Sequence, residues 1–144
     1  MSVSLPPEPA PTAPLRFIAD QRAEARRLEA DGMLPPARLR WRYVLALADK
    51  DEEASREIAR LDVLIRSRRD AALAQGETAV MRGRTAEAQT AFLKALALDG
   101  GNDQARRRLM ELETRAALVR QDRKDARTRA ARNSGTEGPE DEQP

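Results

Sequence analysis

The segment FLKALAL at residues 92–98 repeats the pattern of WRYVLAL at residues 41–47, and the two segments are 51 residues apart. Two helical segments can align their alanines and leucines by chance, but they rarely align turn glycines as well. The same spacing superposes further pairs: Leu109 on Ile58, Leu112 on Leu61, Ala105 on Ala54, Ala88 on Ala37 and Gly83 on Gly32. A repeat of this kind is typical of stacked helical units, because one such unit cannot bury its apolar face alone.

The composition favours an all-helical protein of one domain. Of the 144 residues, 40% are apolar but only 3% are aromatic, so the apolar residues are mostly alanine and leucine, which favour helices. Charged residues make up 35% of the chain and nearly cancel, to a net charge of +2. This balance gives no overall electrostatic reason to expect a nucleic-acid partner.

Proline, glycine and capping residues divide the chain into five expected helices. The first spans about residues 15–31, the second begins at the Pro35-Pro36 pair and reaches about residue 50, and the third runs unbroken over about residues 51–81. Thr85 is expected to cap the fourth helix, and Asn102 the fifth. Asp49 followed by Glu52 resembles a capping box at the start of the third helix.

The repeated residues resemble the tetratricopeptide repeat family. In the second copy the residues that carry the resemblance are Gly76, Gly83, Ala88, Phe92 and Ala95; in the first they are Ala25, Leu28, Gly32, Ala37, Trp41 and Val44. The chain departs from the family in its period of 51 residues, against about 34. The extra 17 residues, 52–68, are expected to lengthen one helix. The resemblance implies an all-α solenoid of two helical hairpins and a long capping helix, with Trp41 and Phe92 in the core.

This interpretation divides the chain into three parts. Residues 1–14 hold five prolines, which favour an extended tether, with a proline-motif ligand as the sharper alternative. Residues 15–132 are the helical domain, with repeat units at 18–51 and 69–102 and a capping helix at 103–132. Residues 133–144 form an acidic tail whose composition predicts disorder.

The family resemblance also implies a binding surface, because the first helix of each repeat lines a concave groove. By position, the expected groove residues are Arg22, Arg26, Leu73, Glu77, Val80, Met81, Arg107 and Glu111. An apolar centre with a charged rim would suit an extended or helical peptide. The alternative is that Leu73, Val80 and Met81 pack against the last helix.

The last expected helix is rich in arginine. Residues 102–132 hold ten basic and five acidic side chains. This helix is either a solvated helix longer than its packing partner or a nucleic-acid-binding element. We favour the first interpretation, because no aromatic side chain lies among the arginines to stack on bases. Oligomerisation through the long helices is a third interpretation.

The sequence lacks the usual residues of catalytic and metal sites. It has no cysteine and no histidine, and it contains neither a phosphate-binding glycine loop nor an HExxH motif. We therefore expect no enzyme, no cofactor and no metal. The expected function is that of an adaptor, scaffold or assembly factor that binds a protein or peptide partner. The absence of a long apolar run or a signal-like start favours the cytoplasm. A start codon assigned downstream of a signal peptide would look the same. The bias toward alanine and arginine suggests a bacterial source.

Overall fold

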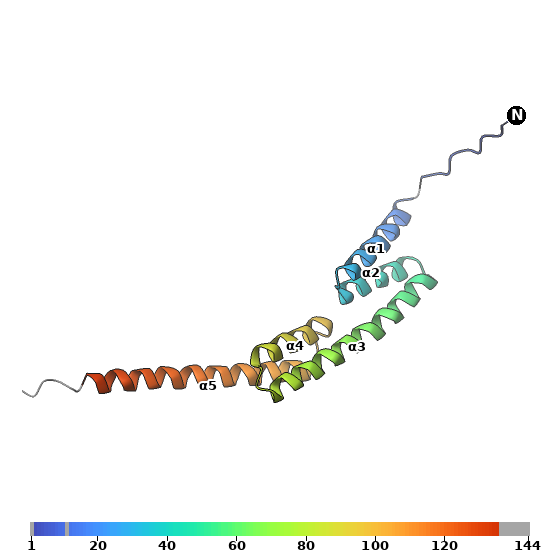
Figure 1. Cartoon of the computed structure of the whole chain (residues 1–144). Helices are drawn as coiled ribbons and strands as arrows, with labels where there is room; N and C mark the ends of the chain where they lie inside the picture. Colours follow the sequence, from blue (N-terminus) through green and yellow to red (C-terminus); the bar gives the residue numbers. More distant parts are fainter. Residues whose placement is uncertain (1, 11, 136–144) are drawn as a thin grey trace, which may run out of the picture. The chain divides into compact units, whose positions relative to one another are not determined.

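A computed structural model describes residues 2–10 and 12–135 of the chain. Its five helices are α1 (Ala13–Ala30), α2 (Leu34–Leu47), α3 (Glu52–Met81), α4 (Thr85–Leu98) and α5 (Asp103–Ser134), which Figure 1 labels in order. Within these described residues there is no β-strand. The predicted all-α class is therefore confirmed.

The prediction of one long third helix is also confirmed. Helix α3 is continuous over 30 residues, because no proline interrupts it and its glycine, Gly76, is tolerated within the helix. Helix α5 begins 51 residues after α3 and has 32 residues, so these two helices repeat one another in position and length.

The turns after α1 and α3 have the same geometry. Gly32 and Gly83 have φ angles of +78° and +68°, which favour glycine because a side chain would be strained there. In both turns the residue after the glycine donates its backbone N–H five residues back, from Met33 to Leu28 (2.8 Å) and from Arg84 to Ala79 (2.9 Å). These bonds are the Schellman pattern, which ends a helix by satisfying its last carbonyls.

Several expected boundaries need correction. Asp51, not Asp49, caps α3: its carboxylate accepts a hydrogen bond from the N–H of Ala54 at 2.8 Å. The reason is that α2 ends at Leu47 and the chain then turns at Lys50, whose φ is +65°. Thr85 is the first residue of α4 rather than the residue before it. Asn102 caps α5 as expected, since its side chain accepts from the N–H of Ala105 at 2.9 Å.

The helical region is longer at both ends than predicted. Helix α1 begins at Ala13 and includes Pro14, because proline in a first turn loses no hydrogen bond. Residues 2–10 and 12 are exposed and lie in neither helix nor strand. At the other end α5 continues to Ser134, whereas most of the predicted acidic tail, residues 136–144, lies outside the described residues.

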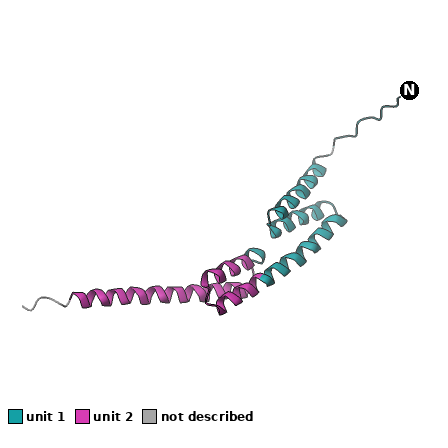
Figure 2. Cartoon of the chain, in the orientation of Figure 1, with its two compact units in different colours: residues 1–71, 97–100 teal, residues 72–96, 101–144 magenta. Residues whose placement is uncertain are grey.

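The chain forms two compact units, coloured separately in Figure 2. Unit 1 contains residues 1–71 and 97–100, and unit 2 contains residues 72–96 and 101–144. Each unit has its own apolar core, and α3 contributes its first part to unit 1 and its last part to unit 2.

The core of unit 1 lies between α1, α2 and the first part of α3. Trp41 is its largest side chain and is 1% exposed. The buried residues are Ala25, Leu28, Leu34, Ala37, Trp41, Val44, Ala54, Leu61 and Ile65. Ion pairs join the same helices at the surface: the guanidinium of Arg60 contacts Glu29 at 2.6 Å, and that of Arg38 contacts Asp62 at 2.6 Å.

The core of unit 2 lies between the end of α3, α4 and the start of α5. Its buried residues are Ala72, Ala79, Ala88, Phe92, Ala95, Ala105 and Leu112. Phe92 is fully buried, and its ring lies directly against Gly76 of α3. Small residues on α3 let α4 approach closely, and the aromatic ring fills the remaining space.

The 51-residue spacing holds for burial as well as for sequence. Seven core positions of unit 1 have a buried counterpart 51 residues later: Ala25 and Gly76, Leu28 and Ala79, Ala37 and Ala88, Trp41 and Phe92, Val44 and Ala95, Ala54 and Ala105, and Leu61 and Leu112. The internal repeat seen in the sequence is therefore a repeat of buried positions.

Candidate functional site

Two of the expected groove residues, Arg22 and Arg26, belong to unit 1 and are engaged within it. Arg22 forms ion pairs with Asp51 and Glu53 at the start of α3. Arg26 also pairs with Glu53, and its guanidinium carbon lies 5.5 Å from the centre of the Trp41 ring, a distance typical of a cation–π contact. Both arginines therefore help to hold α1 against neighbouring parts of unit 1.

The other expected groove residues belong to unit 2 and differ in environment. Leu73 and Val80 are partly buried and pack against the core of unit 2. The exposed ones are Arg107, Glu111 and Met81, which is 84% exposed. The structure thus places Leu73 and Val80 partly in the core of unit 2, whereas Met81, the third apolar residue of the expected groove, is exposed.

Glu77 links α3 to α5. Its carboxylate accepts two hydrogen bonds from the guanidinium of Arg108, at 2.7 and 2.8 Å, and one from the side-chain amide of Gln104 at 3.2 Å. The bonds from Arg108 are the main reason why the pKa of Glu77 lies below its ordinary value; partial burial opposes the shift, and the bond from Gln104 adds to it. Glu111 also pairs with Arg108, at 2.9 Å. This part of the expected groove is an ion-pair network.

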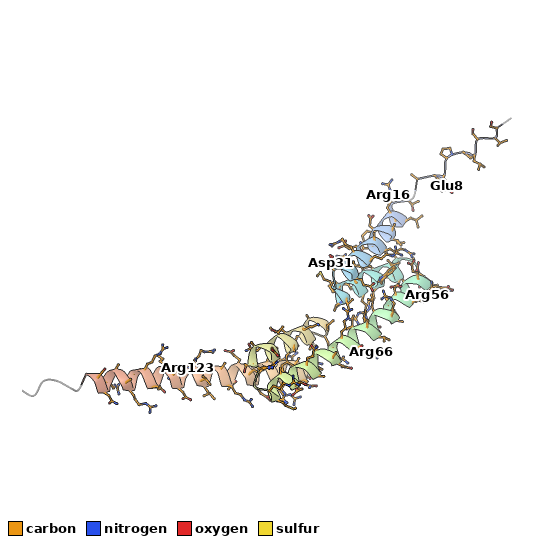
Figure 3. The ribbon with its side chains drawn as sticks, in the orientation of Figure 1. Glu8, Arg16, Asp31, Arg56, Arg66 and Arg123 are labelled. Atoms are coloured by element: carbon orange, nitrogen blue, oxygen red, sulfur yellow. The ribbon has the colours of Figure 1, made fainter. Side chains whose placement is uncertain are left out.

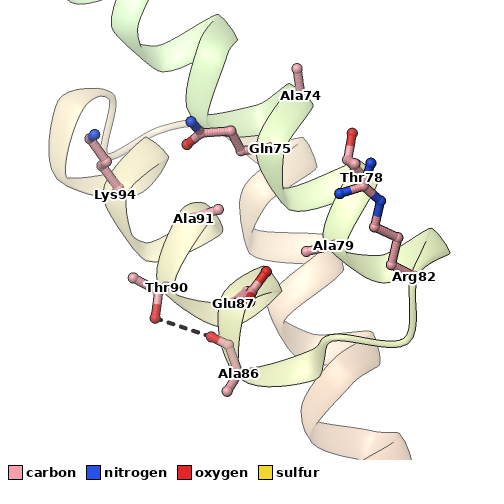
Figure 4. Close-up of a pocket in the computed structure, with 10 residues that line it drawn as sticks. All are labelled: Ala74, Gln75, Thr78, Ala79, Arg82, Ala86, Glu87, Thr90, Ala91 and Lys94. Carbon is pink, nitrogen blue, oxygen red and sulfur yellow. Dashed lines mark hydrogen bonds between the residues drawn. The ribbon is translucent and has the colours of Figure 1, made fainter.

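A hollow of about 770 Å³ lies on the α3–α4 hairpin of unit 2, and we call it the hairpin hollow. Figure 4 shows small side chains between the two helices, with charged ones around them. Its lining residues are Ala74, Gln75, Thr78, Ala79, Arg82, Ala86, Glu87, Thr90, Ala91 and Lys94. The hydroxyl of Thr90 donates to the carbonyl of Ala86 at 3.0 Å, so this polar group is satisfied within its own helix.

The sequence analysis missed the hairpin hollow, although a signal for it exists. Small or short side chains recur four residues apart on α3 (Ala74 and Thr78) and on α4 (Ala86 and Thr90). Residues four apart lie on one face of a helix. Such a pattern is visible in the sequence, but only the hairpin shows that the two faces adjoin.

A second hollow, of about 390 Å³, lies where α5 continues past the turn between α3 and α4; we call it the α5 hollow. It is lined by Val80, Gly83, Thr85, Leu112, Arg115, Ala116, Val119, Arg120 and Arg123. Its floor is apolar, and three arginines border it. Val80 belongs both to the expected groove and to this hollow.

Helix α5 is exposed on all sides over its second half. Every described residue from Ala117 to Gly135 is exposed, including the apolar side chains of Leu118 (61%) and Val119 (49%). Figure 3 labels Arg123 on this half of the helix. Four of its cations stand at positions 120, 123, 124 and 127, which share one helical face.

Neither a metal-binding group of side chains nor a membrane-spanning helix is present among the described residues. No group of three or more acidic side chains is arranged to hold a metal ion. None of the five helices combines the length and apolarity needed to cross a membrane.

Comparison with known proteins identifies no relative of this chain. The sequence matches no protein-family model, no curated protein and no solved structure.

Proposed function

We propose that this chain is a protein–protein interaction module, and that it holds a helix of its partner in the hairpin hollow. The observation that carries the proposal is the hollow itself, which is open, about 770 Å³ in volume and lined mainly by alanine and threonine. Binding an amphipathic helix in a groove is one of the common ways in which proteins recognise peptides. An adaptor, scaffold or assembly factor would use such a surface.

The short side chains of the hollow favour a helical occupant. Where α4 packs on α3 in the core of the same unit, contact is made through Ala72, Gly76 and Ala79, which let the two helix axes approach. Ala74, Thr78, Ala86 and Thr90 offer the same kind of surface in the hollow. The charged residues at its edge, Arg82, Glu87 and Lys94, would set the orientation and association rate of the partner more than its affinity.

This surface differs from the groove that the family resemblance implies. Leu73 and Val80 bury part of their apolar surface against the core of unit 2, and Glu77 is hydrogen-bonded to Arg108. The side chains of the hairpin hollow are more available to a partner, since Ala74, Thr78, Ala86 and Thr90 are exposed.

The experiment is affinity capture from native cells with Thr90→Arg and the matched control Thr114→Arg. Both threonines are exposed, and both donate to the carbonyl four residues earlier, Thr90 at 3.0 Å and Thr114 at 2.9 Å. The two variants should therefore fold equally well, which circular dichroism would check. We expect the Thr90 variant to lose the protein that the parent captures and the Thr114 variant to keep it. Equal capture by both would rule out the hairpin hollow as the binding surface.

A further inference from the structure

The second half of α5 has a counterpart in α3 that is covered by another helix. Since α5 repeats α3 at a spacing of 51 residues, its positions 123, 127 and 130 correspond to Ala72, Gly76 and Ala79 of α3. In α3 these three residues are buried in the core that α4 shares. In α5 the corresponding residues are Arg123, Arg127 and Ala130, and all three are exposed.

The cations lie on the face of α5 that is buried nearer its start. Ala105, Leu109, Leu112 and Ala116 follow one another at spacings of four, three and four residues, and they are buried or half-buried. Continued at helical spacing, this stripe reaches Val119, Arg123 and Arg127. The core-facing stripe of α5 therefore continues beyond the hairpin, where it changes from apolar to basic. We call its basic part, residues 120, 123, 124 and 127, the α5 basic stripe.

Opposite charge is nearly absent from this stripe. Asp122 and Asp125 are the acidic residues of this half of α5, and by helical register they lie on the other side of the helix. Arg120 pairs with Glu113 at 2.8 Å. Arg123, Lys124 and Arg127 form no ion pair with any described residue, and all three are exposed, so they are available to an acidic partner.

Helix α5 has Arg123 and Arg127 where α3 has Ala72 and Gly76, and this difference excludes one kind of partner from the second half of α5. At position 76 of α3 even one added carbon would meet the ring of Phe92 at 2.5 Å, so a helix that packs like α4 needs small residues beneath it. Long arginine side chains at 123 and 127 exclude such a close apolar contact. They favour a partner helix that carries carboxylates at those contacts, since an arginine guanidinium forms strong paired hydrogen bonds with carboxylate.

From these observations we infer that the α5 basic stripe and the adjoining α5 hollow form a second binding site, which takes an acidic amphipathic helix of another protein. The apolar side chains of that helix would occupy the floor formed by Val80, Leu112, Ala116 and Val119. Its glutamates or aspartates would face Arg120, Arg123 and Arg127. The apolar floor favours a protein helix over nucleic acid, because the phosphates of a nucleic acid would bind the cations and leave the apolar floor without a partner. No residue of α5 is aromatic, so stacking on bases has no support either.

The test uses fluorescence anisotropy with three labelled probes and the full chain. The first probe is a helix-forming peptide of about 15 residues, long enough to form a helix on binding, with leucines on one face and glutamates on the others. The second has the same composition with the leucines scattered around the helix. The third is a DNA duplex of about two helical turns. We expect the first to bind most tightly and to weaken as salt is raised from about 0.05 to about 0.5 M.

Matched double variants locate the site on the helix. Arg123→Glu with Arg127→Glu changes the stripe, whereas Arg129→Glu with Arg132→Glu makes the same change of charge on the other side of α5. All four residues are exposed, so neither variant removes a core contact, and circular dichroism would check that helicity is kept. We expect the stripe variant to weaken binding of the first peptide at least about tenfold, a loss of about 1.4 kcal/mol. The control should change it less than about threefold.

Three results would overturn the inference: no measurable binding of the amphipathic peptide, equal losses in the stripe and control variants, or tighter binding of the DNA duplex than of the peptide. The last would make this helix a nucleic-acid-binding element. None of them bears on the hairpin hollow, which shares no residue with the α5 hollow and is tested by Thr90→Arg.

Discussion

Gly76 and Phe92 are in such close contact that a Cβ atom added to Gly76 would stand 2.5 Å from Cε1 of the Phe92 ring and 2.6 Å from its Cζ. Carbon atoms that are not bonded to one another do not approach this closely in proteins, and the ring cannot easily move aside because Phe92 is fully buried. The absence of a side chain at residue 76 is therefore what lets the ring sit between α3 and α4. This contact lies in the core of unit 2, so disturbing it should destabilise that unit.

Gly76→Ala should destabilise unit 2, although alanine is the better helix former. Overpacking a core costs about 1–3 kcal/mol, and the gain in helix propensity is about 1 kcal/mol, so we expect a net loss of up to about 2 kcal/mol. Urea unfolding followed by circular dichroism would measure it. Gly76→Ala should cost less stability in a protein that already carries Phe92→Leu than in the parent, because leucine has no ring for the added carbon to meet. An increase in stability from Gly76→Ala alone would show that the contact is looser than described.

Trp41 should respond differently to two substitutions. Its indole N–H is buried and has no hydrogen-bond acceptor among the described residues. Such a donor costs about 1–3 kcal/mol, and phenylalanine removes it while keeping an aromatic ring. We therefore expect Trp41→Phe to cost less than about 1.5 kcal/mol, and Trp41→Ala about 3–5 kcal/mol. Chemical unfolding would measure the free energy of unfolding of both variants. Equal losses in the two would contradict the prediction.

Gly32→Ala and Gly83→Ala should each cost about 1 kcal/mol. An added Cβ atom would meet nothing within 4 Å at either position, so the cost comes only from the positive φ angles of +78° and +68°. Asparagine tolerates this conformation better than alanine, and Gly32→Asn and Gly83→Asn should cost less. Gly135→Ala is the control, because Gly135 has a φ of −85° and an added carbon would make only ordinary contacts. Thermal melts of the five variants would rank them.

The stability of unit 1 should fall in acid partly because of Asp51. The N–H of Ala54 is the largest cause that lowers the pKa of this carboxyl group below its ordinary value, and the guanidinium of Arg22 adds to it. A carboxyl group whose pKa is lower in the folded than in the unfolded state stabilises the folded state at pH values above its unfolded-state pKa. This contribution is lost as the pH falls through the folded-state pKa. Asp51→Ala should cost about 1 kcal/mol at neutral pH, the usual cost of losing a helix cap.

The pH dependence separates this role from a general effect of charge. In Asp51→Asn the amide oxygen can still accept from Ala54, so this variant should keep most of the neutral-pH stability while showing a smaller acid dependence. Urea unfolding at a series of pH values from neutral to about 3, a range that spans the ordinary aspartate pKa, would compare the variants with the parent. An acid dependence equal to that of the parent in both variants would exclude Asp51 as a contributor.

The sequence by itself determined the order and nearly the bounds of the helices, because the features that start and stop a helix are local. Pro35 and Pro36 are tolerated only in a first turn, Gly32 and Gly83 adopt the positive φ of a terminating turn, and Asn102 caps α5. The 51-residue repeat could also be recognised from the sequence, because the residue types that recur at this spacing are the ones that become buried in each unit. The error at Asp49 arose because the turn at Lys50, which moves the cap to Asp51, has no distinctive residue type.

Only the tertiary structure decided how these helices use their surfaces. Helical spacing says that Leu73 and Val80 share a face with Glu77, but the packing of α3 against its neighbours decides that this face contributes to the core of unit 2. In the same way the small residues of α3 and α4 form a hollow only because the hairpin places them side by side. The stripe of α5 is apolar where the hairpin covers it and basic beyond. Burial depends on contacts between residues far apart in the chain, and local patterns do not specify which of those contacts form.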